Sequence, residues 1–177
     1  MAGKSHGGPP KGPALPYTGS MAEQTNHYLY ATACGPLILE GSAAGLRRAV
    51  FAERPLPGRF APSTLTNEAA SQFQEYLAGK RTAFDIPLDP VGTPFQREVW
   101  EAAGSIPYGQ AITASQLAEA MGRPGSHRSV GAALRRCELA PFLAAHRVAM
   151  GGAADFQGRL FQGFRNLEQR SRSASRP

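Results

Sequence analysis

Hydrophobic and polar residues alternate in short runs through the first half of the chain. Three of these runs are rich in β-prone residues and are broken by glycine-containing turns; they cover residues 28–32, 36–40 and 46–51. This pattern predicts a small antiparallel meander. Apolar residues then recur at helical spacing over residues 67–77, with Asn67 as the N-cap and Gly79 as the stop. A last run at 84–88 is a candidate strand, and together these elements predict an α+β domain over residues 25–88.

A second pattern begins after a linker at residues 87–92, which holds two prolines and a glycine. Thr93 is followed by proline and then, three positions on, by Gln96. This is the pattern of a capping box with proline at the first helical position. The sequence therefore predicts a helix over residues 94–104.

Two further short helices follow, joined by a glycine-bearing turn. Thr113 and Gln116 repeat the capping-box pattern for the first helix, and Ser126 is the expected cap of the second. Apolar residues in the second helix recur at helical spacing and would face inward, whereas its outer face carries Arg128, Ala132, Arg135 and Arg136. This arrangement predicts a helix-turn-helix, in which the small residues at 131–133 allow close approach to a nucleic-acid groove.

The distribution of charge supports a nucleic-acid partner. The chain of 177 residues carries a net charge of +6. Residues 1–120 are nearly balanced, with nine basic against ten acidic residues, whereas residues 121–177 hold ten arginines against three acids. Arginine offers a planar fork of donors suited to phosphates and base edges. A solvated basic face is the alternative interpretation of the same charges.

Composition excludes several other classes of protein. No run approaches the roughly 20 consecutive apolar residues of a membrane span, and we expect no export signal. Two cysteines, Cys34 and Cys137, make a disulfide framework implausible, and four scattered histidines show no metal-ligand spacing. We therefore predict no metal, no cofactor and a cytoplasmic location, associated with the nucleoid in a bacterium or nuclear in a eukaryote.

Six short blocks occur in the order and at the spacing typical of one family. They are TPFQREVW at 93–100, IPYG at 106–109, QLA at 116–118, GRP at 122–124, RSVG at 128–131 and AHRV at 145–148. In this respect the chain resembles the methylated-DNA–protein-cysteine methyltransferases, over roughly residues 28–170. The resemblance implies an α+β protein with a ribonuclease-H-like N-terminal domain. A helical, winged-helix-like DNA-binding domain with the helix-turn-helix would follow it.

The resemblance also implies roles for individual residues. The helix-turn-helix would bind the minor groove, with the damaged guanine flipped out of the base stack into a pocket. Arg128 matches the arginine that fills the gap left by the flipped base, a role suited to a planar cation. The expected DNA-binding residues are Arg128, Ala114, Ser115, Ser129, Ala132, Arg135 and Arg136. The expected lesion pocket comprises Tyr108, Ala145, Val148, Phe156, Gln157 and Gly158.

One departure from the family pattern bears directly on chemistry. Residues 144–147 read Ala-Ala-His-Arg, where members of the family read Pro-Cys-His-Arg. The methyl group of Ala145 has no lone pair, so it cannot attack an alkyl carbon. We therefore expect a degenerate site of Ala145, His146 and Arg147 with no catalytic residue. Neither Cys137, turned inward at a helix C-terminus, nor Cys34, in the other domain, is a credible replacement.

Other departures affect lesion recognition. Alanine stands where the family has a base-expelling tyrosine, a cysteine replaces a bracing asparagine, and an arginine falls about where a relay glutamate belongs, close to Glu168. The substituted positions are Ala114, Cys137, Gln157, Arg159 and Arg170.

We predict from this an alkyltransferase-like protein that binds O6-alkylguanine DNA for repair without alkyl transfer. Enzymatic activity is left open, with its absence favoured. A DNA-binding or regulatory module without lesion specificity is the second hypothesis, and an active alkyltransferase is the third. The predicted partners are double-stranded DNA and nucleotide-excision repair proteins, with no membrane, and the predicted state is a monomer. The predicted domains are a disordered leader at 1–24, the two domains at 25–88 and 93–170, and a disordered basic tail at 171–177.

Overall fold

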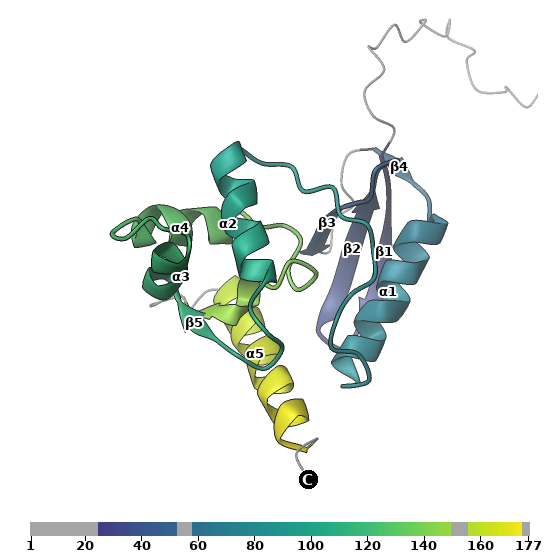
Figure 1. Ribbon diagram of the computed structural model, residues 1–177. Coiled ribbons are helices and arrows are strands. Elements are labelled where there is room, and N and C mark those ends of the chain that lie inside the picture. The colour runs from purple at the N-terminus through teal and green to yellow at the C-terminus, as the bar shows by residue number, and fades with distance from the viewer. Residues whose placement is uncertain (1–24, 53–57, 150–155, 175–177) are drawn as a thin grey trace, which may run out of the picture.

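The computed structural model describes residues 25–52, 58–149 and 156–174. The predicted leader at 1–24 lies outside these residues. The chain forms a mixed α+β structure in which a sheet and one helix come first and a group of helices follows (Figure 1). Within the described residues, no helix combines the length and the apolarity needed to cross a membrane.

The sheet contains the three predicted strands and one more. Its order is β3-β2-β1-β4, built from β1 (Asn26–Thr32), β2 (Gly35–Gly41), β3 (Leu46–Phe51) and β4 (Arg59–Phe60). β2 pairs antiparallel with both β1 and β3, which confirms the meander, whereas β4 pairs parallel to β1. The predicted strand at 84–88 is wrong as a strand: only Leu88 pairs, in a single bridge to Leu46.

Helix α1 (Thr64–Leu77) covers the sheet and begins earlier than the sequence pattern indicates. Its N-cap is Ser63, whose hydroxyl accepts from the backbone N–H of Thr66 at 3.1 Å, while the Thr66 hydroxyl accepts from the backbone N–H of Ser63 at 2.9 Å. Asn67, the predicted cap, lies inside the helix and accepts a hydrogen bond from the Tyr30 hydroxyl. Threonine at the third helical position completes the capping box, where a pattern restricted to Glu or Gln misses it.

The second part of the chain follows the predicted order. Helix α2 (Pro94–Gly104) has the predicted bounds and cap. A two-stranded parallel ladder of β5 (Ile112–Thr113) and β6 (Val148–Ala149) flanks α3 (Ala114–Ala120), α4 (His127–Arg135) and the 3₁₀ turn η1 (Ala145–Arg147). Ser126 precedes α4 as predicted, although its side chain makes no capping hydrogen bond.

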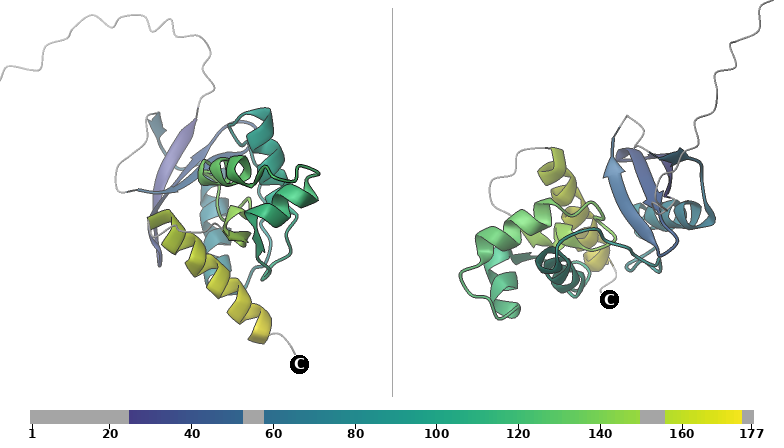
Figure 2. Two further views of the ribbon diagram at one scale, coloured as in Figure 1. Left: turned by 90° about the vertical axis from the view of Figure 1, so that its left-hand side faces the viewer. Right: turned by 90° about the horizontal axis from the view of Figure 1, so that it is seen from above.

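The long helix α5 (Phe156–Ala174) is absent from the sequence prediction. It runs through residues 171–174, so the prediction of a disordered tail from 171 is wrong for these residues, and 175–177 lie outside the described part. Seen from above, α5 stands between the sheet and the other helices (Figure 2). Its Phe164 contacts Phe51 of β3 and Phe73 of α1.

Buried side chains of both parts form one continuous apolar cluster. It includes Leu37 and Phe73 from the first part and Trp100, Val130 and Phe164 from the second. The indole N–H of Trp100 donates to the Ala133 carbonyl at 2.8 Å, fixing α2 against α4. The two parts therefore share a core, and the functional surfaces of the second part rest on the first.

We predict that Ser63→Ala lowers the free energy of unfolding by about 1 kcal/mol, the usual value of a side-chain N-cap. The matched control is Ser71→Ala, an exposed serine within the same helix. Chemical denaturation of the two variants measures the difference. Equal stability of the two variants would contradict the assigned start of α1.

Candidate DNA-binding surface and buried histidine site

Helices α3 and α4 form the predicted helix-turn-helix. Thr113 caps α3 and makes the predicted capping box with Gln116. The turn to α4 contains Gly122 and Gly125 with φ of 69° and 85°, a left-handed conformation that favours glycine. The inner face of α4 buries Val130, Ala133 and Leu134 among others. Ala133 was expected on the outer face and is instead buried against Trp100.

A surface hollow of about 520 Å³ lies between the start of α3 and the outer face of α4. Four of the predicted DNA-binding residues line it together: Ala114, Ser115, Arg128 and Arg135. The other three, Ser129, Ala132 and Arg136, are exposed on or beside the same helix. His127, which the sequence analysis passed over, also lines the hollow. Its place at the start of α4, next to Arg128, was the available signal.

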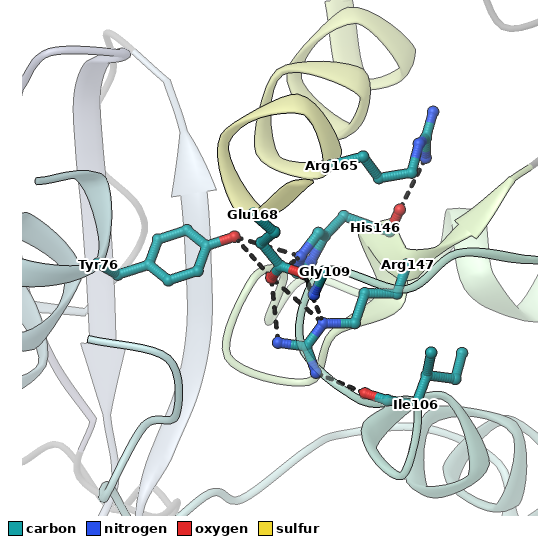
Figure 3. A network of polar contacts seen from close by, with 7 residues as sticks. All are labelled: Tyr76, Ile106, Gly109, His146, Arg147, Arg165 and Glu168. Carbon is teal, nitrogen blue, oxygen red and sulfur yellow. Dashed lines mark hydrogen bonds and ion pairs between the residues drawn. The ribbon is translucent and has the colours of Figure 1, made fainter. Parts of the chain in front are cut away.

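The second candidate site is a buried polar network around Glu168. This carboxylate, 1% exposed, accepts hydrogen bonds from three residues of the second part. His146 Nε2 lies 2.8 Å from Oε1, Arg147 Nε and Nη2 each donate at 3.0 Å, and the Gly109 backbone N–H donates at 2.9 Å. The Tyr76 hydroxyl donates at 2.9 Å from α1 (Figure 3).

Glu168 corrects the sequence analysis, which placed Arg170 about where the family's glutamate belongs. The structure shows Glu168 bonded to His146, whereas Arg170 is exposed and bonds the Asn166 carbonyl. The missed signal was the helical spacing of Phe161, Phe164 and Glu168, which places all three on one buried face of α5.

Three backbone groups help to hold the network in place. Gly109 has φ of 72°, and a Cβ added there would lie 2.9 Å from Arg172 Cδ, so glycine alone lets the chain present its N–H to Glu168. Arg147 is anchored at its other end, where Nη1 donates to the Ile106 carbonyl at 2.6 Å. The His146 carbonyl accepts from Arg165 at 2.7 Å.

Burial and hydrogen bonding set the charges of this network. Burial alone would raise the pKa of Glu168, but hydrogen bonds from His146 and Arg147 hold that pKa at about 2. Burial lowers the pKa of His146, which favours the neutral imidazole despite the adjacent carboxylate. His146 Nδ1 has no hydrogen-bond partner among the described residues, and a buried, unpaired N–H there would be costly. His146 is therefore neutral, with its proton on Nε2.

The backbone before the histidine departs from the family pattern inferred from the sequence. Ala144 has φ of 52°, in the left-handed region, which costs a residue with a side chain roughly 1–2 kcal/mol. Proline, which the pattern inferred from the sequence has at this position, is locked near −65° and cannot adopt this conformation. Ala145 follows Ala144 and is completely buried.

The structure does not bring all predicted pocket residues together. Ala145 and Val148 are both buried beside the network, and the Tyr108 ring lies 5.6 Å from the Arg147 guanidinium. Gln157 instead lines a cavity with Arg135 and Cys137. Gly158 lies in the first turn of α5, and the side chain of Phe156 is outside the described structure.

The two cysteines behave as the sequence indicates. Cys137 is buried at the end of α4, and burial raises the pKa of its thiol to about 12. Burial also raises the pKa of Cys34, in the first part of the chain. Thiolates are the reactive form of cysteine, so neither environment activates the sulfur. Among the described residues, no three His, Cys, Asp or Glu side chains come together to hold a metal ion.

We predict that the free energy of unfolding decreases as the pH falls. In the unfolded chain, His146 binds a proton below about pH 6.5 and Glu168 below about pH 4.5. In the folded chain both pKa values are lower, so protonation favours the unfolded chain as the pH falls. Glu168→Gln should cost roughly 3 kcal/mol at neutral pH, because it leaves Arg147 buried beside a neutral partner. The same substitution should also flatten the dependence of the free energy of unfolding on pH between pH 4.5 and 2.

Glu75→Gln is the matched control, since Glu75 forms an exposed ion pair with Arg81. Its expected cost is below about 1 kcal/mol. Denaturant titrations across the pH range measure the free energy of unfolding of both variants. If its slope between pH 4.5 and 2 is the same in Glu168→Gln as in the natural chain, Glu168 is not the ionised group that we assign.

Comparison with known proteins identifies both parts of the chain. Residues 27–90 match the model of the 6-O-methylguanine DNA methyltransferase ribonuclease-like domain, and residues 94–166 match that of the DNA binding domain of the same family. The described sheet unit and helical unit correspond to these two matches, which confirms the predicted fold class.

Individual relatives agree. The constitutive methylated-DNA–protein-cysteine methyltransferase of Bacillus subtilis is 47% identical over 46% of this chain and 49% of its own length, so the match spans about half of that relative. The Mycobacterium leprae methylated-DNA–protein-cysteine methyltransferase is 39% identical over 64% of this chain and 72% of its own. The structure of Mycobacterium tuberculosis OGT in complex with DNA superposes with a TM-score of 0.73 and 30% identity, covering 82% of this chain and 94% of that one.

These matches correct the prediction that enzymatic activity is absent. That prediction depended on residue 145 alone, whereas both parts of the chain match domain models of this family and the relatives are named for methyl transfer. The expectation favoured in the sequence analysis, that the chain has no enzymatic activity, is therefore contradicted by these relatives. The chain belongs to the methylated-DNA–protein-cysteine methyltransferase family, and it carries both the ribonuclease-like domain and the DNA binding domain.

Proposed function

We propose that this protein binds duplex DNA through α4 and recognises O6-alkylguanine in a pocket closed by η1. The observation that carries the proposal is the hollow in which Arg128 and Arg135 meet Ala114 and Ser115 at the start of α3. The two arginines suit phosphates, and the small residues allow close approach of a nucleic-acid groove. The matched DNA binding domain and the DNA complex of the similar M. tuberculosis protein support DNA binding by this part of the chain.

Arg128 is the residue we assign to the space vacated by a flipped base. It is exposed at the second position of α4, with its side chain lining the hollow. A base leaves the stack at a cost of a few kcal/mol, and a planar cation in its place recovers part of that cost by stacking and hydrogen bonding. Ala114, beside it, offers only a methyl group, so Arg128 bears more of this task.

The lesion pocket would lie on the other side of η1, where Ala145 and Val148 are buried. We propose that recognition here does not use residue 145 as the alkyl acceptor, because an alanine methyl group has no lone pair. The histidine and glutamate beside it are nevertheless fully assembled: His146 Nε2 lies 2.8 Å from Glu168 Oε1. The surroundings of an acceptor are therefore retained while residue 145 itself offers none.

We predict that the protein binds a duplex containing one O6-methylguanine about tenfold more tightly than the same duplex with guanine, a difference of about 1.4 kcal/mol. Arg128→Ala should remove most of that preference. Lys80→Ala is the matched control, because it removes one exposed positive charge from the first part of the chain. Gel-shift titrations at fixed salt measure all three proteins.

Equal affinity of the natural chain for both duplexes would reject lesion recognition. It would favour a DNA-binding module without lesion specificity. Equal losses in Arg128→Ala and Lys80→Ala would reject the assigned role of Arg128.

We predict that Ala145→Cys accepts one methyl group from O6-methylguanine DNA. The new thiol would stand beside the assembled His146–Glu168 pair, and the peptide with residue 145 should become heavier by one methyl group. In the natural chain the same peptide should keep its mass. Mass spectrometry after digestion makes both measurements, and Cys137 in the same digest serves as an internal control. An unmethylated Ala145→Cys variant would show that this pocket does not receive the lesion.

A further inference from the structure

Among the described residues, those that bond the Glu168 carboxylate belong to the second part of the chain except Tyr76. Tyr76 lies near the end of α1, on the helix that covers the sheet. Figure 3 shows its side chain reaching from that helix toward Glu168 and His146. Its hydroxyl lies 2.9 Å from Glu168 Oε1 and 3.3 Å from His146 Nε2. The first part of the chain thus contributes directly to the buried site of the second.

Packing fixes the position of this hydroxyl. The Tyr76 ring is completely buried. It contacts the rings of Phe73, Phe84, Tyr108, His146 and Phe164, with centroids 5.2–6.3 Å away. Contacts on this many sides leave the ring a single orientation. The hydroxyl oxygen is therefore presented to the network in one place, without a flexible side chain to reposition it.

The protons of the network can be placed from these contacts. Glu168 is ionised and can only accept, so the Tyr76 hydroxyl proton points to Glu168 Oε1. The remaining lone pairs of the Tyr76 oxygen then face His146 Nε2. Both atoms that surround Nε2, the phenol oxygen and the carboxylate oxygen, are acceptors, so only a protonated Nε2 fits between them. The lone pair of the neutral imidazole is left on Nδ1, which has no partner among the described residues.

We propose that Tyr76 is a positioning residue, through which the ribonuclease-like domain holds His146 in its Nε2–H form and leaves the Nδ1 lone pair available to the lesion pocket. The use of that lone pair rests on the proposed function. The contacts that fix the proton of His146 on Nε2 do not depend on the proposed function, because they are internal to the protein. The N-terminal domain has, in this view, a direct role in the site as well as a structural one.

The charged side chains around His146, apart from Glu168, do not fix the position of its Nε2 proton. Arg147 and Arg165 are cationic and oppose a proton on the imidazole, whereas Glu168 favours one. Neither arginine forms a hydrogen bond with Nε2, since Arg165 donates to the His146 carbonyl and Arg147 donates to Glu168. Tyr76 is therefore the one described group, besides Glu168, that faces the protonated nitrogen. By donating to Oε1 it also reduces the pull of the carboxylate on the imidazole.

The test is nuclear magnetic resonance of histidine-labelled protein, without DNA. In the natural chain, His146 should show Nε2–H and unprotonated Nδ1 between pH 6 and 8. Tyr76→Phe keeps the ring but removes the donor to Glu168, so the carboxylate should attract the histidine proton more strongly. The pKa of His146 should then rise by at least about half a unit, roughly a threefold change in proton affinity. Tyr28→Phe is the control, as Tyr28 lies in β1 and stacks on Phe60, away from the network.

An Nδ1–H form in the natural chain would overturn the proposal, and so would identical titration of His146 in Tyr76→Phe and the natural chain. If Tyr76→Phe does not fold, the resonance of the Tyr76 hydroxyl proton in the natural chain tests the proposal instead. A slowly exchanging resonance close to the His146 Nε2 proton supports the proposal, and its absence overturns it. Failure of lesion binding would leave these spectra unchanged, so the two proposals can fail separately.

Discussion

The structure depends on one buried carboxylate. Glu168 has almost no contact with solvent, and an isolated charge in that position would be very unfavourable. It is tolerated because donors reach it from α1, from the loop at Gly109 and from η1. Each of these elements is therefore fixed relative to α5. The geometry of the histidine site is a consequence of satisfying this one charge.

Helix α5 has a corresponding role in the core. The face that carries Glu168 also carries Phe161 and Phe164, and Phe164 packs against rings from β3, α1 and the His146 turn. A polar centre and an apolar centre thus lie side by side on one helix. Because both involve the sheet unit and the helical unit, the two units share a single core despite matching separate domain models.

The sequence predicted elements well where local chemistry determines them. The helix at 94–104 has its own capping box and proline, so local signals were sufficient to place it exactly. The start of α1 was misplaced because Thr66 serves in its capping box, and the strand at 84–88 failed because its pairing depends on distant Leu46. Helix α5 was missed because its apolar face is narrow and its outer face strongly basic.

The residues of the candidate site also differ in whether local sequence could predict them. The outer residues of α4 could be predicted, since helical spacing determines which side chains are exposed. Tyr76 could not, because nothing in its local sequence indicates a partner 92 positions away. The same limit explains the overestimate of residue 145: a single substituted position carries chemical information about the acceptor, but none about the assembled network that surrounds it. At residues 144 and 145 the chain reads Ala-Ala, where the family pattern inferred from the sequence has Pro-Cys. Directly beside this turn, the bonds among Tyr76, His146, Arg147 and Glu168 form a complete buried network, which a pattern of single residues in the sequence does not reveal.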